Sequence, residues 1–183
     1  MTIDIEKTFE SDSEIMQILK TIANLELNDS WLCAGFLRNY VWNVLSGRQG
    51  FDTSTDLDVI FYDGTISYAQ TVEMEQKLKE EHPNLNWELK NQVYMHIHNP
   101  NTKPYDSSRE AIAKFPEMCT AIAARLVDGN NIELFLPYGE EDIINFKVRP
   151  TPHFESIERR LIYRNRVLKK HWQIKWSQLQ IEL

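Results

Sequence analysis

The segment Thr55-Asp-Leu-Asp-Val-Ile-Phe-Tyr-Asp63 decides the fold. Its β-branched and aromatic side chains predict a mostly buried strand that begins at Leu57, because such residues pack well on a pleated sheet. Leu57, Val59 and Phe61 fall on one face of this strand, and Asp58 falls on the other. The segment therefore predicts a sheet protein with acidic residues at the N-terminal end of a core strand.

The acidic residues Asp56 and Asp58 stand two positions apart, so the strand period of two directs both carboxylates to one side. Two neighbouring carboxylates repel each other unless a cation lies between them, and Mg²⁺ prefers oxygen ligands of this kind. In a two-metal site, one ion activates an attacking hydroxyl and the other stabilises the leaving phosphate oxygens. The pair predicts a divalent cation site, and a pair that merely caps a loop is the alternative.

A second segment with functional residue types, Gly35-Phe-Leu-Arg-Asn39, lies upstream of the acidic pair. Glycine permits close approach of the backbone to a phosphate, and the start of the following helix offers free N–H groups. Arg38 adds a fixed positive charge. The order of the two segments predicts a phosphate-binding element followed by a metal-binding element.

Hydrophobic periodicity and turn residues predict the other elements. Helices are expected over residues 12–27, 36–45, 68–80, 108–115, 138–146 and 156–172, the first of them opened by a capping box of Ser11 and Glu14. Strands are expected over residues 57–62, 87–91, 93–98, 120–127 and 131–136, the last two joined by an Asp128-Gly129 turn, and residues 31–34 are expected to form either a strand or a tight turn. Together they predict an α/β (α+β) domain over residues 1–150, with a small mixed sheet packed by helices, and a basic C-terminal helical extension over residues 151–183.

Composition supports a folded, intracellular protein. Hydrophobic residues make up 42% and charged residues 26% of the 183 residues, which is the globular range. The net charge of −7 argues against broad coating of nucleic acid, although basic residues gather between 159 and 175, where they form either a solvated helix face or a site for a polyanion. Two distant cysteines, no signal-like N-terminus and no long apolar run predict a cytoplasmic protein with free thiols and no membrane span.

The residues from Ala34 to Leu45, followed by Thr55 to Val59, resemble the head of the DNA polymerase beta-type nucleotidyltransferase superfamily. The likeness is to the Gly-Gly-x-Val-Arg-Asp and Asp-x-Asp pattern of CCA-adding enzymes and bacterial poly(A) polymerases. Ala34 stands where that pattern has its first glycine, and Asn39 replaces its aspartate. Nearly the whole chain also resembles a bacterial family of stand-alone nucleotidyltransferase-like proteins, through the segments 87–92, 95–96, 104–105, 120–125, 137–139, 141–142 and 148–152.

The resemblance implies transfer of a nucleoside monophosphate from an NTP to a hydroxyl, with release of pyrophosphate. It implies that Asp56 and Asp58 bind two Mg²⁺ (or Mn²⁺) ions. A third carboxylate from a neighbouring strand is usual in this superfamily; we expect Glu88 to supply it, and Glu133 is the alternative. The resemblance also implies a nucleotide-binding set that holds the triphosphate and contacts phosphate or ribose: Gly35, Arg38, Asn39, Lys90 and Asn91.

The acceptor, whether a small molecule, a protein or an RNA, stays open. We expect the chain not to add CCA, because it is too short for the further helical domains that grip tRNA. A catalytically silent nucleotide-binding module is one alternative function. A toxin- or antitoxin-like protein that modifies a tRNA or a protein is another, with the basic C-terminal helix as its docking surface.

Several further residues have two possible roles each. His96 and His98 are either structural or in contact with substrate. Arg125, in an otherwise apolar strand, needs either an internal ion pair or a phosphate. Trp172 and Trp176 either pack the last helix on the core or stack a base.

Overall fold

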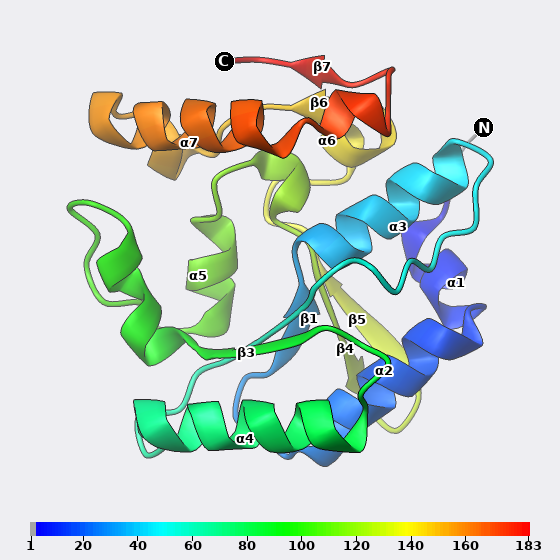
Figure 1. Cartoon of the computed structure of the whole chain (residues 1–183), viewed down its shortest axis with the longest axis vertical. Helices are drawn as coiled ribbons and strands as arrows, with labels where there is room; N and C mark the ends of the chain where they lie inside the picture. The colour runs from blue at the N-terminus through cyan, green and yellow to red at the C-terminus, as the bar shows by residue number, and fades with distance from the viewer. Residues whose placement is uncertain (1–2) are drawn as a thin grey trace.

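A computed structural model describes residues 3–183 (Figure 1). Its centre is a five-stranded sheet in the order β3-β2-β1-β4-β5. Only β2 and β3 run parallel; the other neighbours are antiparallel. The predicted small mixed sheet is confirmed, with these bounds: β1 Trp31–Cys33, β2 Leu57–Phe61, β3 Trp87–Asn91, β4 Ala123–Val127 and β5 Asn131–Phe135.

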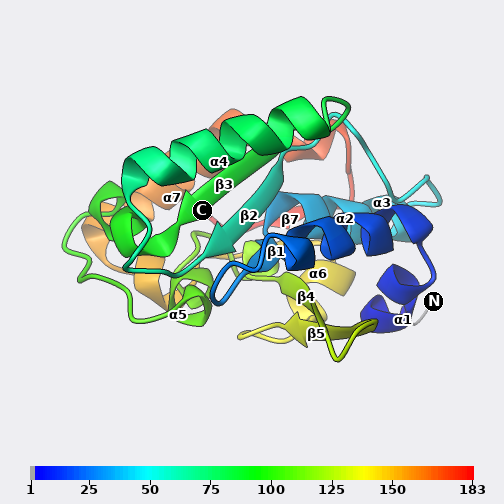
Figure 2. The ribbon, with the colours of Figure 1, turned by 90° about the horizontal axis from the view of Figure 1, so that it is seen from below.

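Helices cover the two faces of this sheet unequally (Figures 1 and 2). The four N-terminal helices share the main core with one face of the sheet, where Leu57, Val59 and Phe61 are buried as predicted. α5 covers part of the other face, where Ile60 and Ile112 are buried together. The helices are α1 Ile5–Glu10, α2 Ser13–Asn24, α3 Gly35–Leu45, α4 Tyr68–Glu81, α5 Ser108–Ala113, α6 Glu141–Ile144 and α7 Ile157–Lys170. None of them, within the described part of the chain, has the length and hydropathy needed to cross a bilayer.

The start of the chain differs from the prediction. α2 is capped by Asp12, not by Ser11: the Asp12 Oδ1 atom accepts from the backbone N–H groups of Glu14 and Ile15 at 2.9 and 3.1 Å. Asp12 has a further partner in this position, because its Oδ2 atom accepts from the Tyr40 hydroxyl at 2.7 Å. The short helix α1 was not predicted; a helix of six residues depends on burial, here of Ile5 and Phe9, rather than on local propensity.

The segment after β3 also differs. Residues 93–98 were expected to form a strand, but Gln92–His98 form the 3₁₀ helix η1. Asn91 causes the turn: its side-chain Oδ1 atom accepts from the Val93 N–H at 3.3 Å, while its Nδ2 atom donates to the backbone carbonyls of Asp63 and Ile66 at 2.7 and 3.1 Å. These bonds end β3 and hold the loop before α4 against it.

The predicted hairpin is confirmed. β4 and β5 pair in register from Ala123 with Phe135 to Val127 with Asn131. Asp128 and Gly129 both have positive φ, 47° and 89°, a conformation that these two residue types adopt at low cost.

Residues 151–183 pack on the same core as the preceding residues. After the 3₁₀ helix η3 (Pro152–Phe154), α7 leads into η4 (Trp172–Ile174) and β7 (Gln180–Ile181), which pairs with β6 (Lys147–Val148). Trp172 and Trp176 are 8% and 2% exposed, and their rings lie 6.1 and 5.1 Å from that of Trp42 in α3. The packing role predicted for these two tryptophans is confirmed.

Candidate functional site

A pocket of about 460 Å³ opens on the sheet face that carries Asp58 and Ile60. Its floor comes from β1, β2 and β3. Its walls come from η1 and the loop after it, from α5 and the residues that follow it, and from α7. The pocket has the size range of small-ligand sites and brings together segments from both halves of the chain.

The strand register brings the acidic residues together. β2 and β3 run parallel with Asp58 opposite Glu88 and Ile60 opposite Lys90, so all four side chains project from the same face. Asp56 precedes β2 directly and lines the same pocket. The structure thus places the three predicted acids, Asp56, Asp58 and Glu88, in one pocket.

The electrostatics of this group favour a cation. Burial raises the pKa of Asp58 to about 6; the Lys90 ammonium opposes this shift, and the Glu88 and Asp56 carboxylates add to it. Lys90 forms an ion pair with the Glu88 carboxylate, whereas neither Asp56 nor Asp58 forms an ion pair with another residue of the range 3–183. A divalent ion beside them would remove the cost of holding Asp58 ionised.

The donor set fits a cation that keeps open positions. No group of three or more His, Cys, Asp or Glu side chains within residues 3–183 has an arrangement that could hold a metal ion by itself. Mg²⁺ is commonly bound by only one or two carboxylates, with substrate phosphates and water in its other positions. Asp56 and Asp58 match that pattern, and a complete protein cage is not required.

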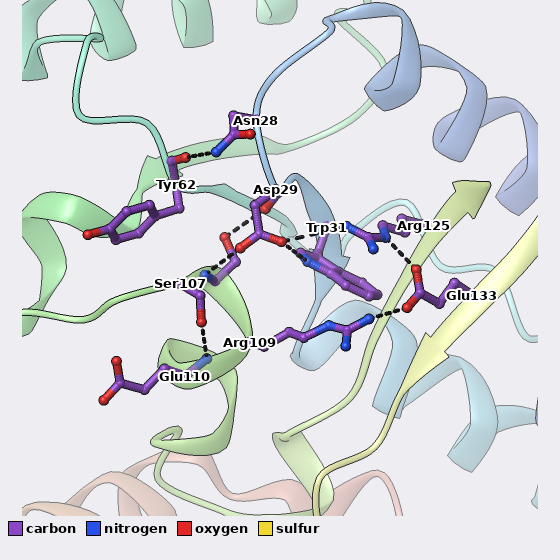
Figure 3. A network of polar contacts seen from close by, with 10 residues as sticks. Asn28, Asp29, Trp31, Tyr62, Ser107, Arg109, Glu110, Arg125 and Glu133 are labelled. Carbon is purple, nitrogen blue, oxygen red and sulfur yellow. Dashed lines mark hydrogen bonds and ion pairs between the residues drawn. The ribbon is translucent and has the colours of Figure 1, made fainter.

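The alternative acid, Glu133, lies elsewhere. It is on β5, and its Oε2 atom accepts from Arg125 Nε at 2.7 Å while its Oε1 atom pairs with Arg109 (Figure 3). Arg125 also lies 3.6 Å from Asp29 and stacks over the Trp31 ring, with its Cζ atom 4.1 Å from the ring centre. The ion-pair role of Arg125 is confirmed. Glu133 pairs with Arg125 and Arg109 and does not line the pocket.

The turn from β1 into α3 has unusual backbone geometry. Ala34, which lines the pocket, has φ 63° and ψ −132°, a region that favours glycine. Its N–H donates to the Ile122 carbonyl at 2.9 Å, and its own carbonyl accepts from the Arg38 N–H at 3.1 Å. Gly35 begins α3 and does not line the pocket; a Cβ atom there would meet only Arg38 Nη2, at 3.6 Å. The residue that needs glycine's freedom in this turn is therefore Ala34.

Ala34→Gly is expected to stabilise the protein. The backbone strain at Ala34 costs on the order of 1–3 kcal/mol, and glycine would relieve it. Against this gain, the extra freedom of glycine in the unfolded chain lowers the free energy of unfolding by about 0.4–1 kcal/mol. The net gain of about 1 kcal/mol corresponds to a rise in Tm of roughly 2–4 °C, measurable by circular dichroism. Ala69→Gly on the exposed face of α4 is the control and should lower Tm; a lower Tm for Ala34→Gly as well would mean that the turn is not strained.

Arg38 lies behind the pocket wall. It is 3% exposed, and its Nη1 atom donates to Thr120 Oγ1 at 2.6 Å, while Nε and Nη2 donate to Asn39 Oδ1 at 3.2 and 2.9 Å. Its guanidinium stacks on the rings of Trp42 and Trp172, at 4.8 and 4.2 Å, and burial lowers its pKa. Arg38 and Asn39 thus support Thr120, which does line the pocket.

The rest of the predicted nucleotide-binding set is divided. Lys90 lines the pocket, whereas Asn91 is 1% exposed and uses its amide on the backbone turn described above. Of the two histidines, His98 lines the pocket, and His96 packs edge-on against Tyr105 with ring centres 6.4 Å apart.

Three cations outside the predicted nucleotide-binding set also line the pocket. Lys114 follows α5, and Arg166 and Lys170 come from α7. The spacing of Arg166 and Lys170 places them on one side of a helix, but the same helix carries several other basic residues with similar spacing. Nothing local to the sequence identifies which of them face the acids.

Comparison with known proteins agrees with this geometry. A family model described as nucleotidyltransferase matches residues 20–181. A solved structure described as revealing a CCA-adding enzyme head domain is 51% identical, covers 97% of this chain and 94% of its own, and superposes with a TM-score of 0.92. No curated protein matches the chain.

Two full CCA-adding enzymes show the same fold at low identity. A complex with CTP is 12% identical with a TM-score of 0.62, and the Thermotoga maritima enzyme in complex with tRNA is 14% identical with a TM-score of 0.61. Each covers 100% of this chain, whereas the chain spans only 44% of either enzyme. The chain belongs to the nucleotidyltransferase family, with the fold of a CCA-adding enzyme head domain.

Proposed function

We propose that the protein is a metal-dependent enzyme that transfers a nucleoside monophosphate from an NTP to a hydroxyl group. The observation that carries the proposal is the strand register that sets Asp58 opposite Glu88, with Asp56 in the same pocket and the pKa of Asp58 raised to about 6. A buried carboxylate with two acidic neighbours is costly unless it serves a cation.

In this reaction the acceptor oxygen forms a bond to the α-phosphorus of the NTP, and the bond from that phosphorus to the bridging oxygen breaks, so that pyrophosphate leaves. Asp56 and Asp58 would hold Mg²⁺ or Mn²⁺, which supplies charge neutralisation and lowers the pKa of the attacking hydroxyl. Glu88, which lies opposite Asp58, would accept the hydroxyl proton or complete the ligand set. Lys90 would pair with a phosphate oxygen.

The other members of the predicted nucleotide-binding set would act through the pocket wall. Gly35, Arg38 and Asn39 form the first turn of α3 and the support for Thr120, and Asn91 ends β3. We propose that they shape the nucleotide site from behind. A cytoplasmic location belongs to the same proposal, in keeping with the free, buried thiols of Cys33 and Cys119.

The acceptor class stays a prediction. Among the structural relatives, a CCA-adding enzyme is in complex with tRNA, so an RNA hydroxyl is one acceptor to test beside small molecules and proteins. A catalytically silent nucleotide-binding module is the alternative, because Ala34 and Asn39 depart from the pattern of CCA-adding enzymes. This alternative predicts NTP binding without release of pyrophosphate.

The test is metal-dependent NTP binding and pyrophosphate release, measured with each of the four NTPs and with Mg²⁺ or Mn²⁺. The wild type is compared with Asp56→Asn/Asp58→Asn. We expect one NTP to bind tightly in a metal-dependent way and the double variant to lose that binding. Glu80→Gln/Glu81→Gln removes the same charge from the exposed surface of α4 and should bind like the wild type. Binding that survives in Asp56→Asn/Asp58→Asn would disprove the assigned metal site.

A further inference from the structure

A fourth acidic residue beside the pocket, Glu117, has no role in the proposed chemistry. It is 0% exposed, and its backbone is held in a bridge to Pro150. Its Oε1 atom accepts from Arg166 Nε at 2.7 Å, whereas its Oε2 atom has no hydrogen-bond partner among the described residues. A buried carboxylate with one unsatisfied oxygen is costly, so this ion pair calls for an explanation beyond stability.

The partner of Glu117 is aimed at the pocket. Arg166 lies on α7, its side chain is 36% exposed, and it lines the same pocket as Asp58. Only its Nε atom is used by Glu117; its two terminal amino groups make no hydrogen bond within residues 3–183. Burial raises the pKa of Asp58, and the Arg166 charge opposes part of that rise. Lys170 lies one helical turn further along α7 and also lines the pocket.

The charges of the pocket walls suit a polyphosphate. Four cations line the pocket beside three carboxylates: Lys90, Lys114, Arg166 and Lys170 against Asp56, Asp58 and Glu88. Arg38 is buried behind the wall, which leaves Arg166 as the guanidinium that lines the pocket. A guanidinium binds two phosphate oxygens at once and loses little freedom when its stem is already fixed.

We propose that Arg166 and Lys170 of α7 bind the triphosphate tail of the nucleotide, and that Glu117 is a positioning residue that holds the Arg166 guanidinium toward the pocket. The inference rests on the proposed function, whose nucleotide would lie between the acids of β2 and β3 and the cations of α7. It assigns the phosphate contact to a helix far along the chain from the Gly35–Asn39 segment.

The test uses inorganic tripolyphosphate and Mg²⁺ as a probe, beside an NTP and the matching nucleoside monophosphate. Arg166→Gln is expected to weaken binding of tripolyphosphate and of the NTP by about 10- to 100-fold, the range for a lost charged hydrogen bond, and to leave monophosphate binding within about 3-fold. Lys170→Gln should weaken the binding of both polyphosphates by about 2- to 5-fold. Arg164→Gln removes the same charge from an exposed position of α7 outside the pocket and should have no effect.

A double-mutant cycle tests the role of Glu117. Glu117→Gln should weaken tripolyphosphate binding about 10-fold in the wild type, and should add nothing in the Arg166→Gln background, because it acts through Arg166. An equal loss in both backgrounds would show a general structural effect and overturn the positioning role. If Glu117→Gln does not fold, Arg166→Lys replaces it: the charge stays but the Nε bond is lost, and affinity should still fall about 10-fold.

The outcomes separate this inference from the proposed function. Tripolyphosphate binding that is unchanged in Arg166→Gln overturns the inference and leaves the metal site of Asp56 and Asp58 untouched. Tighter Mg²⁺ binding by Arg166→Gln, without loss of phosphate affinity, would mean that Arg166 only neutralises the acids. Loss of RNA binding alone would mean that Arg166 belongs to a site for the acceptor. Either result would overturn the inference. Polyphosphate binding that depends on Arg166, without pyrophosphate release, supports the inference and overturns the transfer reaction.

Discussion

Asp58→Asn is expected to lower the rate of nucleotidyl transfer by at least about 1,000-fold, because it removes one of the two cation ligands that we propose at the reacting phosphate. A metal ion contributes several kcal/mol to such a reaction, and each 1.36 kcal/mol is a factor of ten in rate. The loss should be seen in steady-state pyrophosphate release with saturating Mg²⁺, and as loss of the Mg²⁺ dependence of NTP binding.

The same variant should be at least as stable as the wild type. In the folded protein, burial raises the pKa of Asp58 to about 6, from about 3.8 when unfolded. Well below pH 4 the group is protonated in both states and has no effect on stability. As pH rises from about 4 to about 6, the unfolded state loses this proton first, so the folded state loses stability, and the full cost of an ionised buried carboxylate is present above pH 6. Asp58→Asn avoids that cost above pH 6, by about 3 kcal/mol without metal.

Activity and stability together make the test decisive. Lost activity with an unchanged or higher Tm assigns Asp58 to the chemistry, whereas lost activity with a much lower Tm would indicate misfolding. Metal binding by the wild type should weaken as pH falls through about 6, since protons compete for Asp58, and the variant should lack this profile. Glu133→Gln, which disrupts the Arg125 network outside the pocket, is the matched carboxylate control and should keep the transfer rate within about 2-fold.

Trp42→Ala is expected to destabilise the protein by about 4 kcal/mol. Trp42 is fully buried in α3, and its Nε1–H donates to the Ile143 carbonyl at 3.0 Å. The ring packs against Phe146, Trp172 and Trp176, with centres 6.1, 6.1 and 5.1 Å away. Its removal leaves a cavity and an unsatisfied carbonyl, and buried tryptophan-to-alanine changes cost about 3–5 kcal/mol. For a chain of this length Tm should fall by roughly 10 °C.

The same experiment tests the division of the chain at residue 150. Trp42 lies before this boundary, and Trp172 and Trp176 lie after it. Because they share one cluster, we propose that residues 151–183 unfold together with the rest, in a single urea transition seen equally by fluorescence and far-UV circular dichroism. Two separate transitions would instead support an independent extension. Leu161→Ala, on the exposed side of α7, is the control and should change stability by less than about 0.5 kcal/mol.

Strongly patterned segments of this chain were predictable because their structure depends on near neighbours. The alternation from Leu57 to Phe61 identifies both the strand and its buried face, and Asp128-Gly129 identifies a hairpin through positive φ angles. By contrast, the 3₁₀ helix after β3 depends on Asn91 bonding to a loop nearly thirty residues earlier in the chain. The residues of this 3₁₀ helix alternate as in a strand, and only the bonds to the distant loop favour the helix.

The sequence by itself determined that two aspartates stand at the N-terminal end of a buried strand with their carboxylates on one side, because a strand repeats every two residues. Only the tertiary structure decided which groups surround them. The strand order sets β3 beside β2 and β5 at the opposite edge, so Glu88 rather than Glu133 faces Asp58. The C-terminal part of the chain packs back on the sheet, so that Trp172 of η4 covers the Arg38 guanidinium and Arg166 of α7 lines the pocket with the acids. Contacts between strands and between remote helices depend on how whole elements pack, and local residue spacing carries no information about that packing.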